Sequence, residues 1–422
     1  MGSIRRSLSR YANLARLRSR FDADELIDFA RRRAEFRNHA DGLDNNAGLF
    51  DALKVLAHSL GNEAELSLFG KWAVRWDVAR FLGNLARLDA EERRHPAIRA
   101  QPIDKPIFVT GMPRAGTSFL HRLLADDKLN LVPLCWQTIY PYPETARPGF
   151  GRRARSDRRA KTVNRQLDLF RLFAPEMRKV HPFSAESPQE CTEITAHLFQ
   201  SLRFDTTFHV PSYRKWLDEA GHVEAYRFHR RFLQHLQYQM APFRSGGGEK
   251  FRWVLKCPDH VFALDAIKTV YPDARFVFCH RDPLRVLASV AYLTEILRRP
   301  FTRRVDRAQI GRQVALHWAE GARHVMAASE PGASGQHLIY HLDYRDLTGD
   351  PVAAIAGLYD RFGLDLTEDA RLAMTRHVAA KPRGGYGENI YRLEEFGLDP
   401  AHEKRRFADY VAGFGLQPEA AG

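Results

Sequence analysis

A loop rich in glycine has the composition of a phosphate-binding site. A short apolar strand, Ile107–Val109, is predicted to lead into it, and a helix is predicted to begin at Thr117. Gly111 and Gly116 stand with four residues between them, and Thr117 and Ser118 follow. Backbone N–H groups at a helix N-terminus bind phosphate because they point at the ligand and the helix dipole favours negative charge. The spacing therefore predicts a phosphate site.

The cation of this loop is an arginine. In nucleoside triphosphatases with a P-loop, a lysine follows the second glycine, whereas Thr117 holds that position here. The nearest positive charge is Arg114, inside the loop. We therefore expect a phosphate ligand other than Mg-ATP.

A second cation lies at the end of another predicted strand, Trp253–Lys256. A lone ammonium group at the end of a buried strand is costly unless it has a partner or a ligand. Asp259 and His260 follow shortly after Lys256. Asp259 is interpreted as a helix cap. Lys256 and His260 are candidates for chemistry.

A third cation, Arg281, follows the predicted strand Arg275–Cys279. Ser289 lies eight residues further on (289 − 281 = 8), in the helix expected after that strand. From that position its hydroxyl can share an anion with Arg281, whose guanidinium suits a phosphate because its donors form a fork.

Taken together, these motifs resemble the sulfotransferases that use 3′-phosphoadenosine 5′-phosphosulfate (PAPS). The bacterial branch of that family carries Gly-hydrophobic-Pro-Arg-x-Gly-Thr, Leu-Lys-x-Pro-x-His and His-Arg-Asp-Pro signatures. The likeness extends over nearly the whole chain and includes the segments 188–191 and 344–351. The order of the motifs and their spacing, 25 residues from Lys256 to Arg281 (281 − 256 = 25), carry the resemblance.

The resemblance implies where the donor binds. Arg281 and Ser289 would hold its 3′-phosphate. The loop 111–118 would hold the 5′-phosphosulfate through Arg114, Ala115, Gly116, Thr117 and Ser118. A glycine-basic segment would help at the 3′-phosphate through Arg383, Gly384 and Gly385. That segment departs from the Arg-Lys-Gly-x-x-Gly pattern of cytosolic animal members.

Transfer of a sulfuryl group also needs a general base and stabilisation of the leaving phosphate. Lys256 and Arg114 are the candidates for that stabilisation, and no metal is required. His260 is placed like the base histidine of other members and is the preferred base. Glu190 and Glu186 are the alternatives, since some branches use a glutamate.

The elements that must position these residues follow an alternating pattern. From residue 106, short apolar strands alternate with helices, which predicts an α/β fold with a parallel, P-loop-like sheet covered on both faces. Ligands of such sheets bind beyond the carboxyl ends of the strands. Residues 1–100 are expected to form a helical N-terminal cap, with Asp22 capping the first helix. Residues 101–422 form the core, which a helical insertion at about 146–245 interrupts.

Composition sets the outer limits of function. The 422 residues are 44% hydrophobic and 27% charged, typical of a soluble protein, and the net charge is +13. The four cysteines are scattered, which disfavours a metal site and fits the cytoplasm. Residues 1–20 carry six arginines and no acidic residue, so they are a candidate for contact with a membrane surface. No aromatic residues alternate with the arginine clusters, and we expect no nucleic-acid partner.

Two other functions stay open at this point. One is an atypical P-loop phosphotransferase that binds a nucleotide with Mg²⁺, and the other is a basic adaptor without turnover. The acceptor is expected to be a small molecule with a hydroxyl or amine group. A lipid or an aromatic compound fits the aromatic side chains between Phe199 and Phe232, although a helical stripe of this kind also suits a core.

Overall fold

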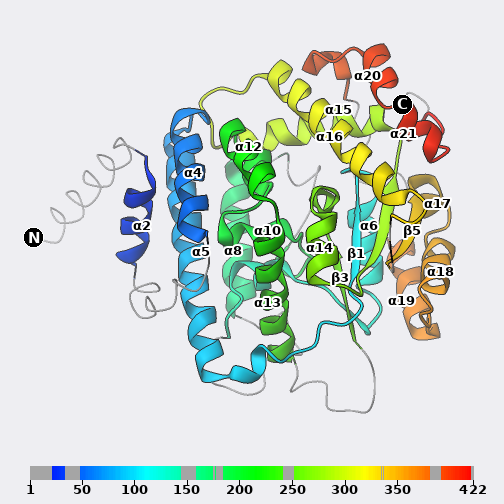
Figure 1. Cartoon of the computed structure of the whole chain (residues 1–422), viewed down its shortest axis with the longest axis horizontal. Coiled ribbons are helices and arrows are strands. Elements are labelled where there is room, and N and C mark those ends of the chain that lie inside the picture. Colours follow the sequence, from blue (N-terminus) through cyan, green and yellow to red (C-terminus); the bar gives the residue numbers. More distant parts are fainter. Residues whose placement is uncertain are drawn as a thin grey trace, which may run out of the picture. The chain divides into compact units, whose positions relative to one another are not determined.

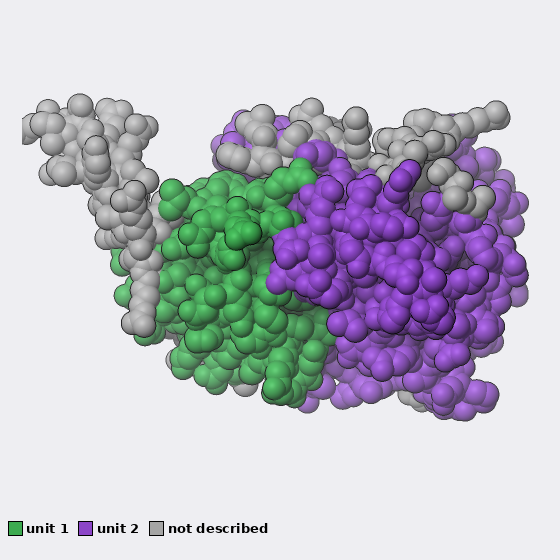
Figure 2. All heavy atoms as spheres, turned by 90° about the horizontal axis from the view of Figure 1, so that it is seen from above, with its two compact units in different colours: residues 1–95, 196–220, 297–305 green, residues 96–195, 221–296, 306–422 purple. Residues whose placement is uncertain are grey.

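The structure is a computed structural model, and it describes residues 21–33, 48–143, 158–173, 176, 184–240, 251–333, 335, 337–380 and 391–419. The chain divides into two compact units (Figure 2). Unit 1 contains residues 1–95, 196–220 and 297–305, and unit 2 contains the remainder. The basic segment 1–20 lies outside the described residues.

Unit 2 contains a five-stranded parallel sheet with the order β2-β3-β1-β4-β5. The strands are β1 (Ile107–Gly111), β2 (Asn130–Leu131), β3 (Arg252–Lys256), β4 (Arg275–His280) and β5 (Leu338–Asp343). The central β1 pairs with β3 through Val109 and Lys256 and with β4 through Gly111 and Cys279. The register therefore brings the loop after β1, Lys256 and the residues after His280 to one edge of the sheet.

Helices connect these strands, and their bounds are as follows. Those of unit 2 are η2 (Pro96–Ile98), α6 (Thr117–Leu124), α7 (Cys135–Ile139), α8 (Arg158–Phe173), α10 (Thr192–Thr195), α13 (Val223–Met240), η6 (Pro258–Phe262), α14 (Leu264–Val270), α15 (Pro283–Arg298, whose last residues belong to unit 1), α16 (Arg307–Ser329), α17 (Tyr344–Gly349), α18 (Pro351–Arg361), α19 (Glu368–Ala379), η7 (Leu393–Phe396), α20 (Pro400–Arg406) and α21 (Ala408–Gly413).

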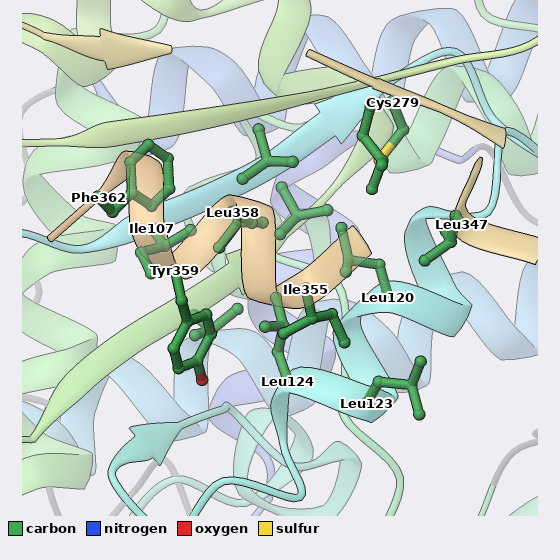
Figure 3. Packing of buried hydrophobic residues seen from close by; sticks show 14 of the residues in the cluster. Ile107, Leu120, Leu123, Leu124, Cys279, Leu347, Ile355, Leu358, Tyr359 and Phe362 are labelled. Atoms are coloured by element: carbon green, nitrogen blue, oxygen red, sulfur yellow. The ribbon is translucent and has the colours of Figure 1, made fainter. Parts of the chain in front are cut away.

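One face of the sheet packs against α6, α18 and α19. Strand residues that include Ile107 and Cys279 meet Leu120 and Leu124 of α6 and Leu358 of α18, all of them buried (Figure 3). Alternate residues of a strand point to opposite faces, so the residues between them form a second core. On that second face the Phe108 ring contacts the rings of Phe276, Tyr271 and His260. Both faces are therefore covered, as the sequence predicted.

Unit 1 is helical. Its helices are α2 (Ala23–Arg31), α4 (Leu49–Asn62), α5 (Leu68–Arg94), η4 (Ala196–Leu198), α11 (Arg203–Thr207) and α12 (Pro211–Ala220). Asp22 caps α2 by accepting a hydrogen bond from the Glu25 N–H at 2.9 Å, as the sequence predicted. Within this unit Phe199, Phe204 and Tyr213 are buried. These three aromatic side chains are thus part of a core.

The sequence predicted four of the five strands of the sheet. It missed β2, because two residues are too short to give an apolar pattern. The helix expected from Asp259 is divided into η6 and α14, which meet at Ala263. No helix among the described residues has the length and apolar character needed to cross a membrane.

Gly111 fixes the approach of β1 to β4, and this leads to a stability prediction. Its φ is +125°, and an added Cβ would lie 2.2 Å from the Cys279 carbonyl oxygen. We expect Gly111→Ala to lower the free energy of unfolding by roughly 2–5 kcal/mol through strain and overpacking. Gly349→Ala is the control, because a Cβ there would meet nothing within 4 Å. Denaturant unfolding measures both, and equal stabilities would contradict the argument.

Candidate active site

The loop between β1 and α6 is held in a conformation that places its amides at a helix start. Arg114 has a φ of +65° and Gly116 a φ of +85°, both in the left-handed region. Gly116 is the N-cap of α6, so the first N–H groups of the helix follow it directly. A Cβ on Gly116 would lie 2.8 Å from Leu347 Cδ2 and 3.1 Å from Tyr344 Cδ2. Packing against α17 therefore keeps the loop tight.

Arg114 joins the loop to the two other described residues that were expected to bind the donor, Arg281 and Ser289. Its Nε donates to Ser289 Oγ at 3.1 Å, and its carbonyl oxygen accepts from Arg281 Nη1 at 2.9 Å. Ser289 comes from α15 and Arg281 from the end of β4. The structure thus brings Arg114, Arg281 and Ser289 together around one point beyond the sheet edge.

This arrangement collects positive charge. Burial lowers the pKa of Arg114, and the nearby charge of Arg281 lowers it further. Arg281 stacks on the Tyr344 ring, with its guanidinium carbon 4.0 Å from the ring centroid. Burial acts to lower the pKa of Arg281, but Glu419, Tyr344 and Asp282 together outweigh that effect and leave it raised. Two arginines in contact make this point a favourable place for an anion.

Lys256 lies in a neighbouring cluster with a carboxylate. Its side chain is only 3% exposed, and its Nζ donates to Ser118 Oγ at 3.1 Å and forms an ion pair with Glu190. The backbone holds this pair in place, because Glu190 forms a parallel bridge with Lys256 and the Cys191 N–H donates to the Lys256 carbonyl oxygen at 3.1 Å. The burial cost of the ammonium is offset by this partner.

An open pocket lies at this cluster. Ser118, Lys256 and Glu190 form part of its wall, and a polar segment before α10 forms another part. The residues that line it are Ser118, His121, Arg122, Cys135, Ser187, Pro188, Gln189, Glu190 and Lys256. The Glu190 side chain is 32% exposed, so its carboxylate is accessible as well as paired.

His260 lies on the second face of the sheet and is fully buried. Its Nδ1 is 2.5 Å from the Tyr226 hydroxyl, and its ring meets that of Phe108 edge-on at 5.0 Å. Its Nε2 has no hydrogen-bond partner among the described residues. Burial lowers the pKa of His260 well below its usual value, and the neighbouring His229 and Lys256 lower it further. His260 does not line the pocket.

The remaining predicted residues have other surroundings. Glu186 accepts hydrogen bonds from Asn164 Nδ2 of α8 at 3.3 and 3.4 Å and does not line the pocket. Arg383, Gly384 and Gly385 lie outside the described residues. Two site residues were given no role from the sequence, although Tyr344 begins the segment 344–351 that is part of the resemblance. Tyr344 packs between Gly116 and Arg281, and Glu419 binds Arg281 from the end of the chain.

The site can therefore bind an anion at Arg114 and Arg281 and, beside it, hold a lysine and a carboxylate at a pocket. The spacing of these groups suits a group transfer in which one end of a phosphorylated donor is clamped and a proton is removed from an acceptor.

Comparison with known proteins shows that the chain is similar to sulfotransferases. The sequence profile of the sulfotransferase family matches residues 106–369, which are more than half of the chain. The omega-hydroxy-beta-dihydromenaquinone-9 sulfotransferase Stf3 of Mycobacterium bovis is 24% identical over 307 residues, which make up 69% of this chain and 70% of that protein.

Solved structures agree with that relationship. The sulfotransferase STF1 of Mycobacterium tuberculosis H37Rv is 30% identical, with a TM-score of 0.76, over 91% of this chain and 98% of that one. The sulfotransferase STF9 of Mycobacterium avium is 24% identical, with a TM-score of 0.81, over 94% of this chain and 98% of that one. The second likeness is one of fold.

The buried histidines around the sheet predict how stability depends on pH. Burial lowers the pKa values of His121, His229 and His280 to about 3, whereas an unfolded histidine titrates near 6.5. Below pH 6.5 the unfolded chain takes up protons that the folded chain does not, until the pH approaches 3. The contribution of these histidines to the free energy of unfolding is therefore fully present above pH 6.5. It decreases as the pH falls below that value, by roughly 1 kcal/mol per pH unit for each histidine.

His229→Gln tests this directly, because it removes one such group. Urea unfolding at pH values from 7 to 5 gives the slope of the unfolding free energy against pH, which measures the protons taken up on unfolding. As the pH approaches 5, we expect this uptake to be smaller than in the wild type by about one proton. His402→Gln, on the exposed surface, is the control. An unchanged slope in His229→Gln would contradict the lowered pKa, because it would show that this histidine takes up protons equally in the folded and unfolded chains.

Proposed function

The chain belongs to the sulfotransferase family, and from that premise we propose that it transfers a sulfuryl group from PAPS to the hydroxyl or amine group of an acceptor. Sulfotransferase activity follows from the family and its relatives. The donor, the acceptor and the residues that act on them are the proposal. Its products are the sulfated acceptor and 3′-phosphoadenosine 5′-phosphate (PAP).

The cluster of Arg114, Arg281 and Ser289 is the observation that carries this proposal. PAPS differs from ordinary nucleotides by its 3′-phosphate, so a site for it needs a second anion subsite beside the loop amides. Arg281 and Ser289 supply that subsite, and Arg114 links it to the loop through hydrogen bonds of 2.9 and 3.1 Å. The amides after Gly116 suit the 5′-phosphosulfate.

Lys256 and Glu190 are assigned to the transfer itself. The lysine ammonium offsets the negative charge that develops on the phosphate as the sulfuryl group leaves. In the structure this ammonium pairs with Glu190. Once Lys256 turns toward the donor, Glu190 gives up this ion pair and becomes a stronger base. Binding of the donor thus activates the group that accepts the proton from the acceptor.

The position of the pocket favours Glu190 over His260 as that base. Glu190 is accessible at the pocket, whereas the ring of His260 is buried and hydrogen-bonded to Tyr226. A general base must reach the proton it removes directly or through one water molecule. Glu186 is bound by Asn164 and is the weaker alternative. His260 is assigned to the support of β3 and α13.

The acceptor is proposed to be a hydroxylated lipid or aromatic compound. The name of the Mycobacterium bovis relative describes a sulfotransferase for omega-hydroxy-beta-dihydromenaquinone-9, a hydroxylated compound. The described pocket is lined mostly by polar residues, which suits the reacting hydroxyl group rather than an apolar tail.

Nucleotide binding provides the first test. We expect PAP to bind in a calorimetric titration without Mg²⁺, and adenosine 5′-phosphate to bind much more weakly. Arg281→Ala should weaken PAP binding by roughly 10- to 100-fold through loss of a charge-assisted fork, and should leave adenosine 5′-phosphate binding nearly unchanged. Arg371→Ala, an exposed arginine of α19, is the control. Binding of ATP alone, and only with Mg²⁺, would contradict the proposal and favour a phosphotransferase.

The base assignment has its own test. Glu190→Gln keeps the size of the side chain but removes the base, so we expect kcat for sulfation of a phenolic or hydroxylated lipid acceptor to fall by about 10²–10⁴-fold while PAP binding persists. Glu186→Gln is the matched control and should change kcat less than about threefold. If His260→Asn, folded by circular dichroism, abolishes kcat while Glu190→Gln does not, the base is His260.

A further inference from the structure

The end of the chain returns to the sheet edge after α21. Tyr410 and Phe414 fix this helix beside β4. The Tyr410 hydroxyl and His280 Nδ1 share a hydrogen bond of 2.7 Å, and the rings of Phe414 and His280 stack with their centroids 4.1 Å apart. Leu416 is buried, the next two residues are exposed, and Glu419 is again half-buried. Glu419 therefore reaches the site across a short exposed link.

Glu419 binds the arginine to which the donor's 3′-phosphate is assigned. Its two carboxylate oxygens accept from Nε and Nη2 of Arg281, each at 2.7 Å, and its backbone N–H donates to Asp282 Oδ2 at 3.1 Å. This is the paired geometry with which a guanidinium also binds two phosphate oxygens. Both side chains are 21% exposed, so the contact lies at the mouth of the site rather than in the core.

The orientation of Arg281 does not depend on Glu419. The third nitrogen, Nη1, is held by the Arg114 carbonyl oxygen at 2.9 Å, and the guanidinium stacks on Tyr344. These contacts leave the Nε and Nη2 edge to whichever anion is present. The Glu419 carboxylate offsets the positive charge of the two arginines. A phosphate bound in its place would offset that charge equally well.

We propose that Glu419 is an internal competitor of the donor: the C-terminal tail covers the 3′-phosphate subsite on Arg281, and the nucleotide binds by displacing it. This inference rests on the proposed function, because that function assigns Arg281 to the donor. A tethered competitor lowers the apparent affinity for PAPS and for PAP by the fraction of time that the site is covered. It also speeds the release of PAP, since the carboxylate re-occupies the arginine as the product leaves.

The test compares PAP binding in the full chain and in two variants of the tail. We expect Glu419→Gln, and separately a truncation after Leu416, to tighten PAP binding roughly 3- to 30-fold in calorimetry. Glu394→Gln, an exposed glutamate of η7, is the charge-matched control and should bind like the wild type. In the Arg281→Ala background the Glu419→Gln substitution should have no effect, because the residue for which the two anions compete is gone.

The outcomes separate this inference from the proposed function. Weaker or unchanged PAP binding in Glu419→Gln and in the truncated chain would overturn the inference, and a weaker affinity would make Glu419 a positioning residue for Arg281. If PAP binds the wild type with dependence on Arg281, the proposed function stands even then. If PAP binds neither the wild type nor the variants, both fail together.

Discussion

The contact between Arg114 and Arg281 is the constraint on which the rest of the site depends. Arg281 Nη1 donates to the backbone carbonyl oxygen of Arg114 at 2.9 Å, and the two positive side chains lie near enough that the charge of Arg281 lowers the pKa of Arg114. Such an arrangement is stable when an anion or a polarisable ring offsets the charge. Here Tyr344 stacks on Arg281 and Glu419 forms an ion pair with it. The site is thus arranged to hold negative charge.

The parallel sheet supplies the rigidity that this arrangement requires. Gly111 allows β1 to approach β4 so closely that any side chain would meet the Cys279 backbone, and the loop then turns through Arg114 with a positive φ. The strain of that residue is of order 1–3 kcal/mol and is sustained by the packing around it. Because the carboxyl ends of β1, β3 and β4 share one edge, the residues that end or follow these three strands meet there.

The sequence predicted the parts of this site but not their partners. Local signals sufficed for the loop at Gly111 and Gly116, since glycine spacing and an apolar strand act over a few residues. The pairing of Lys256 with Glu190 joins residues 66 apart, and that of Arg281 with Glu419 joins residues 138 apart. Such contacts arise from the tertiary fold, which places a tail or a polar segment beside a strand end, and no local pattern encodes them.

The same reasoning applies to the choice between His260 and Glu190. The resemblance made His260 the preferred base, because it is placed like the base histidine of other members of the family. Whether its ring faces the pocket depends on how η6 turns, and in the structure the ring packs on Phe108. Glu190, in contrast, reaches the pocket through a backbone bridge to Lys256. Lys256 is nearly excluded from solvent and pairs with Glu190 in the structure. In the mechanism that we propose, the donor replaces Glu190 as the partner of this ammonium, so that donor binding is coupled to the release of a base.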